Sequence, residues 1–441
     1  MIKFKSVKFV ILIMLLCSTL TVGGCWDSTE LQYFGVVLGA GIDIIPESER
    51  VGNNKILLTV AIASLGKSDS GLGDDPQSNV YEASGESVAI AARNLTNVID
   101  QQLFWGHDQV LLIGEEILND GLNKHLDFFI RNSKIRPAMR LIAVKGNAKD
   151  YFGNTGSNSV IFSYGTPAVS INNLQQGLAT ASYVTLQNYM ETAITGYSAT
   201  ILPLAHKQSA DIKNTQATGG SSSPETDSTA PASQNPSDSG EDWKKDSATN
   251  RVSFDGMVVL STAGQTVISI TAEETISAML WNSQIHSFLI SCPYPDSASE
   301  TDIQLSFTMD DIKIRRSWRY NGNSPLLKLD VSFSAILEEI NSGGDIYSAN
   351  IYSKEDMNAI NELLQKEMHR HLLLAWDKAM ETKQDFIGLG THMRRYNNKE
   401  WQIFKDNWSD SMNAVKLEIK TSSSVKFIGD INNAKNQPDF K

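Results

Sequence analysis

The 441-residue sequence is poor in cysteine, in positive charge and in long apolar runs, and each shortage excludes a class of protein. Three cysteines cannot build the disulfide framework of a small secreted scaffold. A formal net charge of −12 argues against nucleic-acid binding, which needs a basic face to neutralise phosphates. No run reaches the roughly 18 to 20 apolar residues of a transmembrane helix, so we expect no membrane-spanning segment.

The sequence also lacks the short motifs that mark common active sites. It contains no Gly-x-Ser-x-Gly elbow, no Walker Gly-x-x-x-x-Gly-Lys and no His-Glu-x-x-His. Gly39-Ala40-Gly41 lacks the third glycine of a dinucleotide fingerprint. His369 and His371 lie two residues apart on a predicted helix, about 200° around its axis, which predicts one buried and one solvated imidazole. We therefore predict a protein that is not an enzyme and binds no metal and no cofactor.

Three further sets of residues have a simple interpretation and a functional alternative. His107 precedes a predicted buried strand, where it is either a structural hydrogen-bond donor or part of a functional loop. The adjacent acid pairs Glu115-Glu116 and Glu338-Glu339 indicate solvated faces rather than acid–base catalysis. Three tryptophans indicate core packing, with a partner-facing aromatic patch as the alternative: Trp376, Trp401 and Trp408.

The first 25 residues predict a lipoprotein signal peptide over residues 1–24. A basic start is followed by the apolar run Phe9–Leu20, about 18 Å of helix and too short for a ~30 Å hydrocarbon core. Val22–Cys25 resembles the bacterial lipobox, in which the cysteine thiol is diacylated. The alternative is an ordinary secretory signal in which Cys25 is incidental. With Cys25 acylated, Cys292 is a lone thiol and no structural disulfide is expected.

The chain divides into two halves joined by a flexible linker. We predict a mixed α/β N-terminal region over 25–205, as one unit or two subdomains, and an α+β C-terminal domain over 252–441. The segment 206–251 between them is rich in Ser, Pro and Gly and has too few aliphatic side chains to offset the entropy of ordering. The fold class is therefore α+β or mixed α/β, with mixed β-sheets packed by helices.

In the first half, hydrophobic patterning predicts alternating strands and helices. The run Lys55–Ala63 predicts a strand buried on both faces, and Ser84 or Ser87 can cap the following helix. That helix presents four apolar residues at helical spacing: Val88, Ala91, Leu95 and Val98. The other predicted elements are strands at Val36–Leu38, Ile42–Ile45, Gln109–Ile113 and Met139–Lys145, a loop at Gly66–Asn79, and helical segments at Glu115–Asn132, broken at Gly121, and Val184–Ile194.

The second half opens with a predicted hairpin over Met257–Leu260 and Gln265–Ile270. Thr271–Glu274 has a capping-box pattern that begins a helix, and Ser353 with Asp356 has a second. The second box opens a long helix, 353–382, with one apolar stripe: Met357, Ile360, Leu364, Met368, Leu372, Ala375 and Ala379. Alternating apolar residues predict strands at 303–307, 327–337, 415–419 and 425–428, with a turn at Asn321-Gly322.

Several segments occur in the order of a known family. Gly24–Leu31 followed by Gly39–Asp43 resembles the mature start of the spore germination C subunits, the Ger(x)C family of germinant receptor lipoproteins. The resemblance continues through Gly106-His107, Val110–Glu116, Gly121, Leu126–Phe129, Arg131, Ile135-Arg136, Gly256, Glu274-Thr275, Glu338–Ile340, Asp385–Gly390, Trp401 and Trp408. The sequence departs from the family in its longer linker and in Met257-Val258, where Leu or Ile and then Ala are common.

This resemblance implies a lipid-anchored C subunit of a spore nutrient germinant receptor, attached through Cys25 to the outer face of the inner spore membrane. It implies membrane-embedded A and B subunits as partners and no catalytic residues. The alternatives from other classes are a solute-binding lipoprotein of an ABC transporter and a surface hydrolase. A solute-binding protein would need two similar lobes, whereas the two halves here differ in pattern.

Overall fold

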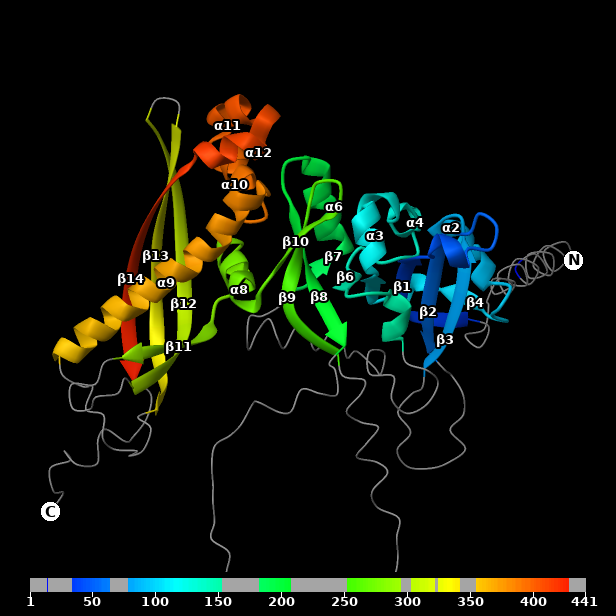
Figure 1. Cartoon of the computed structure of the whole chain (residues 1–441), viewed down its shortest axis with the longest axis horizontal. Coiled ribbons are helices and arrows are strands. Elements are labelled where there is room, and N and C mark those ends of the chain that lie inside the picture. The colour runs from blue at the N-terminus through cyan, green and yellow to red at the C-terminus, as the bar shows by residue number, and fades with distance from the viewer. Residues whose placement is uncertain are drawn as a thin grey trace, which may run out of the picture.

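The computed structural model describes residues 34–63, 78–152, 182–207, 252–294, 303–321, 324–341 and 354–427, together with Met14. They form an elongated molecule with one sheet toward each end, and the predicted mixed α/β fold class is confirmed (Figure 1). Six predicted features lie wholly or mainly outside the described residues: the signal peptide, Cys25, the loop at 66–79, the linker, Gly322 and Ser353.

The first sheet contains ten described strands in the order β10-β9-β8-β6-β5-β1-β2-β3, with β4 beside β1 and β7 beside β6. Its central strands β1, β5, β6 and β8 are parallel, and antiparallel strands extend it on both sides. The strands are β1 (Phe34–Ile44), β2 (Ile56–Ala63), β3 (Ser78–Gly85), β4 (Gln102–Phe104), β5 (Val110–Ile113), β6 (Arg140–Val144), β7 (Val184–Thr185), β8 (Thr200–Lys207), β9 (Val252–Leu260) and β10 (Thr266–Ile270).

The helices of the first half are short and follow the predicted caps and breaks. Ser87 caps α2, where its hydroxyl accepts a hydrogen bond from Ile90 N at 3.4 Å. Gly121 adopts φ +111° and ends α3, as predicted. The helical elements are η2 (Glu47–Glu49), α2 (Val88–Leu95), η3 (Trp105–His107), α3 (Glu115–Asp120), η4 (Leu122–Lys124), α4 (Asp127–Arg131), η5 (Ala148–Tyr151) and α6 (Leu186–Thr195).

Three local predictions in this half are wrong. The two short strands at 36–38 and 42–45 are one strand, β1, because Gly39 and Gly41 pair with both β2 and β5, and the register shift between Val37 and Gly39 does not end the strand. Val98 lies beyond the end of α2 and is 57% exposed. Ser78 and Asn79, predicted as loop, begin β3, whose pairing with β2 extends over the full strand.

The second sheet contains four described strands in the order β11-β12-β13-β14, and β14 runs parallel to β13. Helix α9 covers one face and buries most of the predicted stripe, while Met357 is half-buried (Figure 1). The elements are α8 (Ala272–Trp281), β11 (Phe288–Tyr294), β12 (Ile303–Asn321), β13 (Ser324–Asn341), α9 (Lys354–Thr382), α10 (Leu389–Tyr396), α11 (Asn398–Phe404), η7 (Lys405–Asn407), α12 (Trp408–Ser411), η8 (Met412–Ala414) and β14 (Lys416–Phe427). The two closing strands predicted separately form the single β14.

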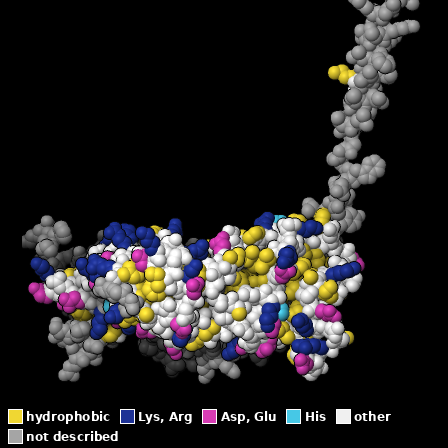
Figure 2. Space-filling view, turned by 90° about the horizontal axis from the view of Figure 1, so that it is seen from above, with side chains coloured by type: hydrophobic (Ala, Val, Ile, Leu, Met, Phe, Trp, Pro, Cys, Tyr) yellow, Lys and Arg dark blue, Asp and Glu magenta, His cyan; other side chains and the backbone are white. Residues whose placement is uncertain are grey.

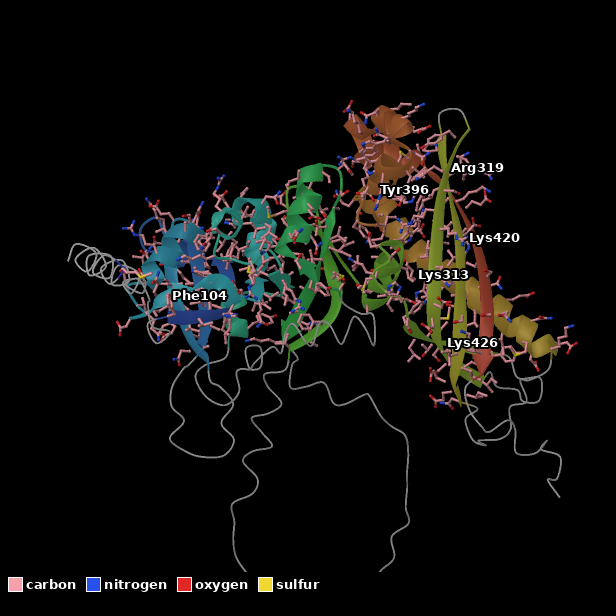
Figure 3. All side chains as sticks on the ribbon, turned by 180° about the vertical axis from the view of Figure 1, so that it is seen from behind. Phe104, Lys313, Arg319, Tyr396, Lys420 and Lys426 are labelled. Carbon is pink, nitrogen blue, oxygen red and sulfur yellow. The ribbon has the colours of Figure 1, made fainter. Side chains whose placement is uncertain are left out.

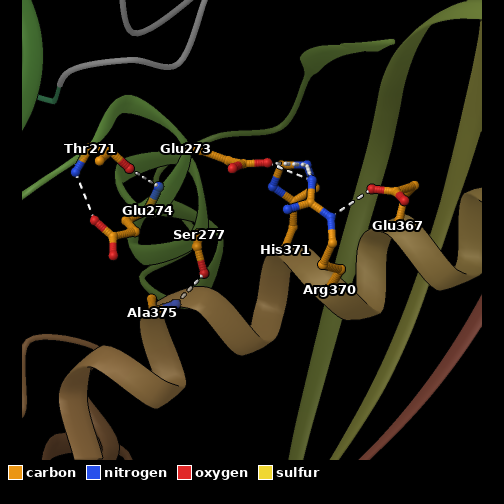
Figure 4. Close-up of polar contacts among 8 residues, drawn as sticks. All are labelled: Thr271, Glu273, Glu274, Ser277, Glu367, Arg370, His371 and Ala375. Carbon is orange, nitrogen blue, oxygen red and sulfur yellow. Dashed lines mark hydrogen bonds and ion pairs between the residues drawn. The ribbon is translucent and has the colours of Figure 1, made fainter. Parts of the chain in front are cut away.

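Helix α8 begins with the predicted capping box of Thr271 and Glu274 and packs on α9. Ala375 N donates to the buried hydroxyl of Ser277 at 2.9 Å, at the point where the helices meet (Figure 4). At the surface, Arg370 of α9 bridges Glu273 of α8 and Glu367 of its own helix. The two helices are therefore joined by a hydrogen bond in the core and by ion pairs at the surface.

The boundary between the sheets does not coincide with the boundary between the predicted halves. The hairpin β9–β10 forms as predicted but pairs with β8 and so completes the first sheet. Val258 and Leu260 enter the core of the first sheet, whereas Met257 and Val259 enter the core of the second half. Because β9 is apolar on both faces, it is stable only where a layer covers each side. Strand β9 thus belongs to both cores.

Gly256 in β9 generates a stability prediction. Its φ is +93°, and a Cβ there would overlap the carbonyl oxygen of Ile270 in β10. We expect Gly256→Ala to lower the free energy of unfolding by about 3 kcal/mol or more, from backbone strain plus steric overlap. Gly52→Ala is the control, since Gly52 has φ +62° with no atom near its Cβ position, and should cost about 1–2 kcal/mol. Equal losses in denaturant unfolding would contradict the prediction.

Candidate functional site

Cys25, the predicted lipidation site, lies outside the described residues, so the site geometry concerns other positions. Cys292 in β11 is a free, buried thiol. Burial raises the pKa of Cys292 to about 11, which keeps the thiol protonated at neutral pH. This cysteine therefore packs as a small apolar side chain.

The histidines and acid pairs noted in the sequence do not converge on one site. As predicted, His371 is buried and His369 is exposed. Burial lowers the pKa of His371, with Arg370 acting in the same direction, so this imidazole stays neutral. His107 is exposed, and its ring centroid lies 5.7 Å from that of Phe104. The acid pairs are exposed and the three tryptophans are buried, as predicted, and no group of three potential metal ligands occurs among the described residues.

Asp43 fixes the end of β1 through hydrogen bonds to the backbone of η5. Its carboxylate is 3% exposed and accepts from Ala148 N at 2.6 Å and Lys149 N at 2.9 Å. Burial raises the pKa of Asp43 to about 6, although these two donors oppose the shift. A Cβ at Gly114 would overlap its Oδ1 atom, which explains the glycine there.

Asp385 has the same role after α9. Its Oδ1 accepts from Leu389 N at 2.8 Å, and its Oδ2 accepts from Gly390 N at 2.7 Å and Trp408 Nε1 at 2.9 Å. Burial raises the pKa of Asp385, and the three N–H donors lower it. A Cβ at Gly390 would lie 2.9 Å from the Trp408 indole nitrogen, so this turn requires glycine. The segment Asp385–Gly390 therefore fixes α10 against α12.

The first half contacts this turn directly through the residues between α6 and β8. Ala199 N donates to the backbone oxygen of Asp385 at 3.1 Å. The hydroxyls of Ser198 and Thr391 are 3.2 Å apart, and the rings of Tyr197 and Trp401 meet at 4.6 Å between centroids. These contacts place α6 of the first half opposite α10 of the second.

A cleft of about 590 Å³ lies at this junction. Its walls come from α6 in the first half and from α8, β12 and α10 in the second. The charged and imidazole side chains that line it are Glu191, Arg316, Asp385, His392 and Arg395. Its volume is in the range of small-molecule sites, so the cleft is the candidate binding site of the described structure.

Arg316 and His392 determine the electrostatics of the cleft. The Arg316 guanidinium lies 5.3 Å from the centroid of the Trp281 ring, and burial lowers its pKa to about 10, so it remains cationic. His392 Nδ1 accepts from Trp318 Nε1 at 2.9 Å. Burial, with Arg316 and Arg395, lowers the pKa of His392 to about 4. The imidazole is therefore neutral at pH 7, with its proton on Nε2.

A second candidate feature is a group of basic side chains on the second sheet. Lysine and arginine side chains are exposed on the face of the second sheet away from α9, although the whole chain is acidic (Figure 3). They are Lys313, Arg315, Arg319, Lys416, Lys420 and Lys426, and we call this set the basic face. In the view from above, basic side chains are frequent at this end, and hydrophobic ones gather over the first-sheet half (Figure 2).

The buried Asp43 predicts a pH dependence of stability. Because its folded pKa of about 6 exceeds the ordinary 3.8, the folded state binds more protons between these values, and stability falls as pH rises through them. Between pH 3.5 and pH 6.5, the free energy of unfolding of the wild type should fall by about 3 kcal/mol relative to that of Asp43→Asn. The figure follows from about 1.36 kcal/mol for each unit by which the folded pKa exceeds the ordinary one. Chemical denaturation across this range measures the difference. Asp311→Asn is the control, because Lys313 lowers the pKa of that exposed carboxyl. The contribution of Asp311 to stability therefore rises with pH, whereas that of Asp43 falls.

The Asp385 turn predicts a contrast between two buried tryptophans. Trp408→Phe removes a hydrogen bond to a buried carboxylate, which should cost about 1.5–3 kcal/mol beyond the smaller ring. Trp401→Phe makes the same change in size, but the Trp401 indole donates no hydrogen bond to a described residue. Equal losses of unfolding free energy in the two variants would show that the hydrogen bond contributes nothing.

Comparison with known proteins matches each half to a family of spore germination domains. The Spore germination protein N-terminal domain family matches residues 27–207, and the Spore germination B3/GerAC like, C-terminal family matches residues 255–429. No described helix is long and apolar enough to cross a membrane.

Individual relatives cover nearly the whole chain. The chain is 22% identical over 440 residues to spore germination protein KC of Bacillus subtilis (strain 168), with 97% of each chain covered. It is 19% identical to spore germination protein B3 of the same organism, over 92% of this chain and 95% of that protein. The crystal structure of the GerBC protein is similar in fold, with a TM-score of 0.51 and 15% identity over 90% of this chain and 99% of that one. The chain therefore belongs to the GerAC/GerKC/GerBC family of spore germination C subunits.

Proposed function

We propose that this chain is the lipid-anchored C subunit of a spore nutrient germinant receptor. It acts as a non-catalytic interaction module beside membrane-embedded A and B subunits, on the outer face of the inner spore membrane. The observation that supports this proposal is the match of both family domains, in order, over residues 27–207 and 255–429.

The anchor is proposed at Cys25, two residues before the first matched position. Two acyl chains on this cysteine give durable attachment, because each buried methylene contributes about 0.8 kcal/mol. Attachment confines the protein to the plane of its partners and raises its effective concentration, so that weak contacts suffice for assembly.

The shape of the molecule and its charge support a contact role. Strand β1, the first described strand, and the second sheet lie toward opposite ends of the elongated structure (Figure 1). The basic face is therefore at the end of the described structure away from the strand that follows the proposed anchor. Complementary charge on a partner subunit would favour association at that face.

The decisive test is Cys25→Ala in spores, followed by membrane fractionation and affinity purification of the A and B subunits. We expect the variant to leave the membrane fraction and to recover the partners poorly, with nutrient germination impaired. The folded part should be unchanged, because Cys25 precedes the first described strand.

Cys292→Ala is the matched control, since it removes the other cysteine of the mature chain from a buried position. It should remain in the membrane fraction and recover the partners normally. If the Cys25→Ala protein stayed at the membrane and supported normal germination, the anchoring mechanism would be wrong.

A further inference from the structure

The cleft between the two halves contains an arginine that has no hydrogen-bonding partner among the described residues. Arg316 lies on the inward face of β12, next to the buried Trp318, and stacks on the fully buried Trp281. A guanidinium offers five N–H donors. Within the described part of the chain, Arg316 makes no hydrogen bond and no ion pair.

The carboxylates that line the cleft already accept hydrogen bonds from other residues. Both oxygens of Asp385 accept hydrogen bonds, from Leu389 N, Gly390 N and the Trp408 indole. Asp385 therefore attracts Arg316 through space without pairing with it. Glu191 is exposed on α6 and accepts from Gln187 Nε2 at 2.8 Å. Arg316 is half-buried and has lost part of its hydration, so an external anion would supply hydrogen-bond acceptors that the described residues do not provide.

The remaining lining suits an oxygen-rich anion. The Ser198 and Thr391 hydroxyls are hydrogen-bonded to each other, so one of their two protons remains available to a ligand. His392 is neutral with its Nε2 protonated, and Arg395 adds a second cation at the exposed end of α10. Trp281 and Phe386 give the cleft an apolar part.

We infer that this cleft binds a small organic oxyanion, whose carboxylate or phosphate group pairs with the planar guanidinium of Arg316. A bidentate pair of this kind is short and directional, which favours arginine over lysine at the position. Because the cleft has walls from both halves, a bound anion would contact α6 on one side and β12 with α10 on the other. Binding would therefore stabilise the junction of the halves.

The test uses the full acylated chain in detergent, titrated with sodium succinate and separately with inorganic phosphate. Calorimetry should show saturable binding of at least one probe, and hydrogen exchange should slow in residues 192–199 and 388–396. Arg316→Gln should weaken binding at least about tenfold, and Arg316→Lys should recover part of it.

Arg315→Gln is the matched control, because Arg315 is the neighbouring residue on the opposite, exposed face of β12. It should leave the affinity within about twofold, since an exposed charge on the far face contributes only screened attraction. Succinate and phosphate distinguish a carboxylate from a phosphate ligand, and either result supports the inference. Absence of saturable binding of both probes to the wild type would overturn it, as would equal weakening by Arg315→Gln. Either failure leaves the proposed receptor function intact, because membrane fractionation and partner recovery measure that function separately.

Discussion

The antiparallel pairing of β8 with β9 is the interaction on which the rest of the structure depends. β8 closes the N-terminal family domain, and β9 is the first described element after it. Their ladder places one apolar face in the core of the first sheet and the other against α8. This arrangement brings α6 opposite α10 and so creates the cleft. Without the ladder, the two halves would share neither a core nor a site.

Two buried aspartates give a structural reason for two of the segments that resemble the family. Asp43 and Asp385 each accept backbone N–H groups that would otherwise be buried without partners, and glycines beside each carboxylate admit it. Their segments, Gly39–Asp43 and Asp385–Gly390, are therefore explained by folding. Arg316 and the basic face lie outside these two segments, whereas Asp385 and Phe386 also line the cleft.

The sequence predicts local elements well and long-range ones poorly. The cap at Ser87, the capping box at Thr271 and the end of α9 near Thr382 depend on neighbouring residues, and the structure confirms them. The strand β3 and the sharing of β9 depend on partners far along the chain. Arg316 was missed because a bulge between Asp310 and Lys313 shifts the inward face of β12 from odd to even positions, which a strict alternation from Ile303 cannot reveal.

The position of β14 has a consequence for aggregation between copies of the protein. It is the last strand in the described order of the second sheet, and such a strand presents a row of backbone groups to which another chain can add. Lys416, Lys420 and Lys426 recur along it on the exposed face. Like charges on two approaching copies repel one another, so these lysines protect against strand-to-strand aggregation. This protection matters most for proteins concentrated on a single surface.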